Sequence, residues 1–169
     1  MNALVMWYLN RIISTLFLSA ALAACGTQPA PPAERPPLEG AKIGGPFTLV
    51  DKDGEVVRWS DFDGQYRIVY FGFTFCPDAC PMDMQAMAQG FRAFEASHPA
   101  RAARVQPIFI TIDPARDTPE AVGQFAAAFH PRLIGLTGTP EQVDAAAQAL
   151  AAYYAKGEET GGGYLMDHS

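Results

Sequence analysis

The pattern of hydrophobic and polar positions predicts buried strands along the chain. Residues 67–75 are β-branched or aromatic almost throughout and lack polar alternation, which is typical of a strand covered on both faces. We expect this strand at the centre of a sheet. A second apolar strand is expected over 105–112 and a short third strand over 133–136. Ahead of them, apolar stretches on both sides of the turn-prone Asp53-Gly54 predict a hairpin over 47–57.

Helical periodicity separates these strands. Residues 81–97 place methionine, alanine and phenylalanine three and four positions apart along one face. A second helix is expected to begin after Thr118, a good N-cap, and to end at Phe129. A third begins with a capping box at Thr139 and continues through an Ala-rich stretch to about Tyr154. Because buried strands alternate with helices, the predicted fold class is α/β, with a largely parallel or mixed sheet flanked by helices.

The N-terminal segment has the features of an export signal. Arg11 precedes an apolar run that is too short to span a bilayer comfortably and ends in Leu22-Ala23-Ala24-Cys25. Small residues directly before a cysteine resemble a bacterial lipobox, so we expect a signal peptide over 1–24 and a diacylglyceryl thioether on Cys25. An uncleaved anchor, or a secreted protein with an incidental cysteine, is the alternative.

The next stretch predicts how the domain is placed in the cell. Residues 25–45 are rich in proline and poor in large apolar side chains, which is typical of an extended spacer. It would hold one domain over 46–169 away from a membrane. We therefore expect a bacterial envelope protein, lipid-anchored and facing the periplasm, with the choice of inner or outer membrane left open.

Composition excludes one class of partner. The 169 residues are 49% hydrophobic and carry a net charge of −6. Such a chain can bury one modest core but has no broad basic surface for phosphates, so we expect no nucleic-acid partner.

Two cysteines remain for chemistry in the predicted domain. Cys76 and Cys80 lie where the first buried strand ends and a helix begins, a usual place for the sites of α/β sheets. The helix N-terminus would favour a thiolate there. One pair is too few for a disulfide scaffold, and outside the cytoplasm a disulfide can persist. On the residues alone, redox work, metal binding and a single structural disulfide remain open.

The spacing of the pair favours copper among the metals. A separation of four lets both sulfurs face one side of a helical turn with room for an ion between them, although it does not forbid a disulfide. Two thiolates form a soft pair that suits Cu(I), and one imidazole would complete a three-coordinate site. Structural zinc would need a fourth ligand, for which the sequence offers no candidate.

The sequence resembles the SCO/SenC copper proteins of the respiratory chain. The resemblance covers most of 47–169 and rests on four motifs in a fixed order: Phe71 to Pro81 (FGFTFCPDACP), Thr111 to Pro119 (TIDPARDTP), Leu136 to Thr139 (LTGT) and Tyr164 to Ser169 (YLMDHS). Each motif alone would be weak, whereas the ordered set is highly specific.

The resemblance implies a thioredoxin-like fold and one copper ion, Cu(I) or Cu(II), bound by Cys76, Cys80 and His168, with a Cys76–Cys80 disulfide in the oxidised form. It also implies a role in building the binuclear copper centre of cytochrome c oxidase subunit II, by copper delivery, by reduction of the target cysteines, or both; the copper donor is not identified. The family continues past the histidine motif with a strand pair and a helix. We therefore expect a C-terminally truncated fragment in which His168 is less firmly held.

Three functions compete on these residues. A metallochaperone would need both cysteines and His168 but no catalytic turnover. A thiol-disulfide oxidoreductase would attack with one cysteine and resolve with the other, without the histidine. A peroxidase is suggested by Thr74, close before Cys76, but the Cys-Pro-Asp-Ala-Cys-Pro core argues against it.

Several neighbouring residues have simpler interpretations. A lone histidine near a chain end, such as His168, is commonly solvated, and Asp167 could orient its imidazole or be merely exposed. The methionines over 82–87 are expected in the core rather than on a metal. The polar loop at 113–117 is expected to be held by local hydrogen bonds, with partner recognition as a second role.

Overall fold

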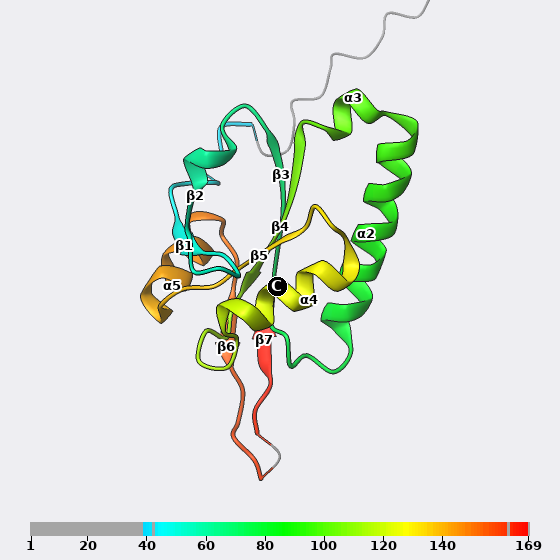
Figure 1. Ribbon diagram of the computed structural model, residues 1–169. Helices are drawn as coiled ribbons and strands as arrows, with labels where there is room; N and C mark the ends of the chain where they lie inside the picture. Colours follow the sequence, from blue (N-terminus) through cyan, green and yellow to red (C-terminus); the bar gives the residue numbers. More distant parts are fainter. Residues whose placement is uncertain (1–38, 42, 162, 169) are drawn as a thin grey trace, which may run out of the picture. The chain divides into compact units, whose positions relative to one another are not determined.

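The computed structural model of the chain describes residues 39–41, 43–161 and 163–168. The chain divides into two units between Ala41 and Lys42, and every element described below belongs to the second (Figure 1). The predicted signal peptide, Cys25 and most of the 25–45 spacer lie outside the described residues and stay predictions. Across the described part of the chain, no helix combines the length and apolar character needed to cross a membrane.

The centre of the fold is a parallel sheet of three strands in the order β3-β4-β5. Their bounds are Tyr66–Gly72 for β3, Val105–Thr111 for β4 and Ile134–Leu136 for β5. The expectation that the first of these is central is wrong, because β4 lies between the other two and is buried almost throughout. Strand β3 leaves Tyr66 and Ile68 exposed. An apolar sequence indicates that the two faces of a strand are covered. It does not indicate whether neighbouring strands pair with both edges of that strand.

Helices cover both faces of this sheet, as predicted (Figure 1). From β4, Phe109 packs with Met84 and Val122 on the side of α2 and α4. The neighbouring Ile108 and Ile110 point to the other side, into a cluster with α5 and the β1–β2 hairpin. The bounds are Ala79–Ser97 for α2, Pro99–Ala102 for α3, Pro119–Phe129 for α4 and Pro140–Ala149 for α5.

The predicted helix starts are confirmed, and one predicted end is wrong. The Thr118 hydroxyl accepts from the Ala121 N–H, and Thr139 and Gln142 form the capping box. Helix α5 ends at Ala149 and not near residue 154. The Ala151 N–H donates to the Gln148 carbonyl and the Ala152 N–H to that of Ala147, which closes the helix in a Schellman motif. Ala151 adopts a φ of 55°, a conformation that glycine usually adopts at helix ends. Because alanine stands there, the sequence gives no local signal for the end of the helix.

Two antiparallel hairpins complete the fold. Strands β1 (Thr48–Val50) and β2 (Val56–Arg58) confirm the first, with Gly54 at a φ of +78° in the turn, and a short 3-10 helix, η1 (Trp59–Phe62), follows. The second, formed by β6 (Tyr154–Lys156) and β7 (Met166–His168), was not predicted. It emerges as the long arm coloured orange to red in Figure 1 and carries the last motif of the sequence.

Candidate metal centre

The two cysteines occupy different positions at the start of α2. Strand β3 ends at Gly72, and Cys76 lies half-buried in the loop that follows. Cys80 is the second residue of α2 and is fully buried. The Cys80 N–H donates to the Cys76 sulfur at 3.3 Å, so Cys76 lies at the positive end of the helix.

This placement separates the acidities of the two thiols. Burial opposes the charged form of Cys76, but hydrogen bonds from the Cys80 thiol and from the N–H groups of Cys80, Asp78 and Ala79 outweigh it and lower the pKa of Cys76. Burial, followed by the hydrogen bond to Cys76, raises the pKa of Cys80 to about 11. Cys76 is therefore the more readily ionised thiol, and Cys80 keeps its proton at neutral pH.

The predicted histidine ligand reaches the site from the opposite end of the domain's sequence. His168, the last residue of β7, places its Nε2 atom 3.5 Å from the Cys80 sulfur, across a separation of 88 residues. The rings of Tyr70 and Phe73 lie edge-on to the imidazole at 6.0 and 6.4 Å. Asp167 is exposed, because successive side chains of β7 point to opposite faces.

A glycine permits the close approach of Cys80 to the sheet. A Cβ atom on Gly72 would lie 3.2 Å from the Cys80 sulfur, 3.1 Å from the Phe109 ring and 2.8 Å from the Tyr70 ring. Any larger residue would displace at least one of them. Gly72 therefore allows the thiol, the sheet and the Tyr70 ring to share one small volume.

Tyr70 is a site residue that the sequence analysis missed. Its hydroxyl donates to Asp83 at 3.0 Å. Burial, followed by the charge of Cys80 and the bond to Asp83, raises the pKa of Tyr70. A phenol that stays protonated beside the thiol keeps this wall of the site uncharged.

A buried carboxylate holds the loop that carries Cys76. Asp117 is 1% exposed and accepts three hydrogen bonds: from the Thr74 N–H at 3.0 Å, the Thr74 hydroxyl at 2.5 Å and the Thr111 hydroxyl at 2.6 Å. The expected local hydrogen bonds of the 113–117 loop are present between Asp113 and Arg116, and Asp117 in addition bonds to Thr74, 43 residues away. The Thr74 hydroxyl is committed to Asp117, which weakens the peroxidase hypothesis.

The sulfur and imidazole donors suit a soft metal ion, although they are not arranged around a common metal position. The Cys80 sulfur contacts both His168 and Cys76, while the Cys76 sulfur also accepts from the Cys80 N–H. Within residues 39–41, 43–161 and 163–168, no three histidine, cysteine, aspartate or glutamate side chains already form a metal cluster. Two sulfurs and one imidazole still match the donor preference of Cu(I).

The other soft or imidazole groups lie away from this cluster. Met84 and Met87 pack in the core as predicted, whereas Met82 is 64% exposed. His130 is buried and bonds to Glu95, and His98 bonds to Ser97. None of them joins Cys80 and His168.

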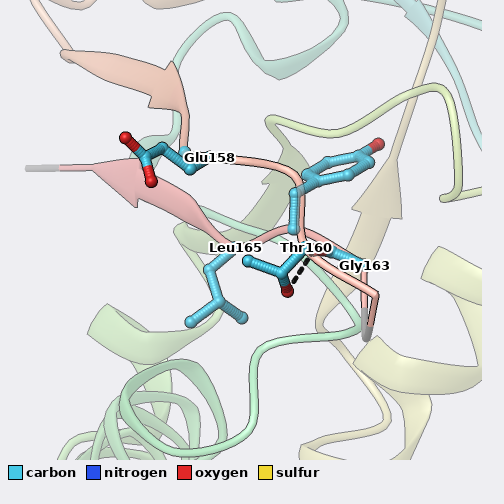
Figure 2. A pocket seen from close by; sticks show the side chains of 6 residues that line it. Glu158, Thr160, Gly163 and Leu165 are labelled. Atoms are coloured by element: carbon cyan, nitrogen blue, oxygen red, sulfur yellow. Dashed lines mark hydrogen bonds between the residues drawn. The ribbon is translucent and has the colours of Figure 1, made fainter.

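A cavity of about 340 Å³ lies in the loop between β6 and β7. Figure 2 shows the residues that line it. Glu158, Thr160, Gly163 and Leu165 line it, and the Thr160 hydroxyl donates to the Gly163 carbonyl at 3.2 Å. Gly157 and Tyr164 complete its lining, which includes none of the candidate copper ligands.

Comparison with known proteins gives consistent matches. The family model described as SCO1/SenC matches residues 35–169. The mitochondrial protein SCO1 homolog 1 of Arabidopsis thaliana is 43% identical over 136 residues, which cover 80% of this chain and 40% of that protein. Among curated relatives the chain spans about half of their length, with 40%, 50% and 57% in three of them.

Solved structures agree in fold. The crystal structure of Arabidopsis thaliana ScoI with copper bound has a TM-score of 0.70 and 42% identity, covering 75% of this chain and 77% of that one. BsSco, described as a member of the Sco family of cytochrome c oxidase assembly proteins with a disulfide switch, has a TM-score of 0.54 and 25% identity, covering 65% and 64%. The central parallel sheet flanked by helices is thioredoxin-like, as expected.

Proposed function

Because this chain belongs to the SCO1/SenC family, we propose that it is a copper metallochaperone that binds one copper ion through Cys76, Cys80 and His168. Its target is the binuclear copper centre of cytochrome c oxidase subunit II. The observation that carries the proposal is the 3.5 Å contact between the Cys80 sulfur and His168 Nε2. A relative of similar fold is solved with copper bound, and another is described as an oxidase assembly protein.

The geometry supports an ordered capture of copper as cargo. Cys76 is half-buried and has a lowered pKa, so its thiolate is the first ligand offered to an incoming ion. Cys80 binds next and releases its proton, because a thiol ligates as the thiolate. His168 adds a neutral imidazole. Delivery reverses this order by ligand exchange, with thiolates of the acceptor replacing the buried pair.

A second function draws support from the difference between the two thiols. In a thiol-disulfide oxidoreductase, the Cys76 thiolate attacks a disulfide of the target and releases one target thiolate. Cys80, after losing its proton, attacks the Cys76 sulfur of the mixed disulfide. The second target thiolate leaves and a Cys76–Cys80 disulfide remains, so two electrons pass to the target. His168 has no part in these steps.

The proposed location follows from the N-terminal residues. We propose that 1–24 are removed, that Cys25 carries the lipid and that the spacer to residue 45 holds the domain over 46–169 at the periplasmic side of a membrane. Within the described part of the spacer, the Gly44 N–H donates to the Ala149 carbonyl at 2.7 Å. This contact ties the end of the spacer to α5.

An anaerobic Cu(I) competition titration of the reduced full chain tests the proposal. Wild type should hold one copper ion, and His168→Ala should bind at least about tenfold more weakly, because one of three ligands is lost. His98→Ala is the matched control, since His98 is exposed and its ring contacts Ser97 and Phe94, away from the cysteines. Equal weak binding by wild type and His168→Ala, with ready disulfide exchange, would instead favour the oxidoreductase.

A further inference from the structure

Charged side chains contact both the ring and the hydroxyl of Tyr164. Its ring centroid lies 3.7 Å from the Arg116 guanidinium carbon and 4.0 Å from Lys156 Nζ. Its hydroxyl donates to Asp113 at 2.9 Å. Two cations on the ring and a carboxylate on the hydroxyl fix both the position and the rotation of this side chain.

The other ends of these contacts belong to the loop that follows β4. Asp113 is 3% exposed, and its second carboxylate oxygen accepts from Arg116 Nε. Arg116 also donates from Nη1 to the Tyr164 carbonyl at 3.0 Å. The loop therefore contacts both the side chain and the backbone of Tyr164, which lies 51 residues along the chain from Asp113. We call Asp113, Arg116 and Tyr164 the tyrosine clamp.

The hairpin that carries His168 is attached to the domain through side chains of both of its strands. From β6, Tyr154 pairs with His168, packs against the core cluster and donates its hydroxyl hydrogen to Asp144 of α5. Among the described strands, β7 pairs with β6 alone. Met166 inserts into the cluster formed with Phe73 and Cys80, and Tyr164 enters the clamp. A strand pair of three residues has little stability of its own, so such side-chain anchors determine where His168 lies, and Met166 and Tyr164 are the anchors on the segment that carries it.

We propose that Asp113 and Arg116 are positioning residues for the copper ligand His168, acting through Tyr164. The inference rests on the proposed function. The same loop holds the other half of the site, because Asp117 fixes Thr74, two residues before Cys76. One short loop therefore sets both the thiolate pair and the imidazole relative to the end of β4.

Arginine suits this task better than lysine. Its guanidinium lies 5.0 Å from the Phe75 ring and 5.8 Å from the Phe73 ring, in addition to the Tyr164 contact. A planar cation can stack on rings while its edge donates to a carboxylate and a carbonyl. Lysine would keep the charge but could not stack on the rings and donate to the carboxylate and the carbonyl at the same time. Arg116→Lys should therefore have the same effect as removing the clamp.

The test compares Tyr164→Leu and Arg116→Lys with wild type. The matched control is Tyr153→Leu, because Tyr153 is 62% exposed on the same segment. Cu(I) affinity should fall by about 10- to 100-fold in both clamp variants, as for other residues that orient metal ligands. The Cu(II) electron paramagnetic resonance signal should lose nitrogen coupling and approach that of His168→Ala. The control should match wild type in both.

Two measurements on the metal-free chain separate positioning from folding. Hydrogen exchange of the β7 amides should accelerate in the clamp variants, while exchange in β4 stays unchanged. The alkylation rate of Cys76 should stay at the wild-type value, because Asp117 holds that loop. Faster exchange throughout β4 would reduce the clamp to a stability role and overturn the proposal.

The outcomes also distinguish this inference from the proposed function. Unchanged copper affinity and unchanged β7 exchange in the clamp variants would overturn the positioning role while wild type still binds copper. Failure of wild type to bind copper would instead overturn the proposed function, and with it the assignment of His168 as the ligand that the clamp positions.

Discussion

The two halves of the candidate site are supported in different ways. The cysteine half lies at the join between β3 and α2, with Cys80 fully buried and Cys76 bonded to the helix backbone. The histidine half lies on a two-stranded hairpin that contacts the domain through Tyr154, Met166 and the tyrosine clamp. The cysteine half therefore belongs to the core of the fold. Of the two proposed functions, thiol exchange would use this half alone, whereas copper binding would need the histidine half as well.

The largest effect is expected from removing the carboxylate beneath the cysteine loop. Asp117→Ala would leave the Thr74 N–H and two hydroxyls without their buried acceptor. Since each unsatisfied buried donor costs about 1–3 kcal/mol, the free energy of unfolding should fall by roughly 3 kcal/mol or more. Urea denaturation measures the loss.

Asp117→Asn is the matched variant for this prediction. It keeps the shape and one acceptor oxygen but introduces an NH₂ group opposite a hydroxyl, so its loss should be smaller than that of Asp117→Ala. Equal stability of the alanine variant and wild type would show that the cysteine half is not anchored by this carboxylate, and the contrast between the halves would fail.

The two thiols of the cysteine half should differ strongly in reactivity. The pKa of Cys76 lies below its ordinary value of 9.0 and that of Cys80 is raised to about 11. A lower pKa means more thiolate at a given pH, so at pH 8 the ionised fraction of Cys76 should exceed that of Cys80 by about 100-fold or more. Iodoacetamide labelling followed by mass spectrometry across pH 6 to 10 reports each site separately. Equal labelling of both cysteines would remove the distinction between attacking and resolving thiol.

The contact between Cys80 and the sheet can be tested through Gly72. Gly72→Ala would place a methyl group 2.8 Å from the Tyr70 ring and 3.2 Å from the Cys80 sulfur. Overpacking of this kind costs about 1–3 kcal/mol, and it should also weaken Cu(I) binding by moving the sulfur away from His168.

Gly90→Ala is the control for that substitution. Gly90 lies within α2, and a methyl group added there would have nothing within 4 Å of it. Alanine at this position should therefore stabilise the helix by about 0.5–1 kcal/mol and leave copper affinity unchanged. A Gly72→Ala chain as stable as wild type would indicate that Cys80 and Tyr70 have more room than the geometry shows.

Local signals in the sequence predicted more of the cysteine half than of the histidine half. Thr118 and Thr139 act on N–H groups three residues away, and their helix starts are confirmed. The strand-to-helix join around Cys76 follows from the same kind of local pattern. The hydrogen bonds that Thr74 donates to Asp117 and Tyr164 donates to Asp113 span 43 and 51 residues, and only the packed fold brings those partners together. The copper ligands themselves were predicted, and their assignment to this chain stays a prediction.

The smallest effect is expected where the histidine half begins. Ala151 ends α5 at a φ of 55°, three residues before β6, and is exposed. An L-residue with a Cβ atom costs about 1 kcal/mol in this conformation, whereas glycine adopts it freely. Ala151→Gly should therefore raise the free energy of unfolding by about 0.5–1 kcal/mol in urea. Copper affinity should not change, because Tyr154, Met166 and the clamp, rather than the helix end, hold the strands around His168. A change in copper affinity that accompanies the change in stability would mean that the turn between α5 and β6 also helps to position His168. The two halves of the site would then be less independent than the contacts indicate.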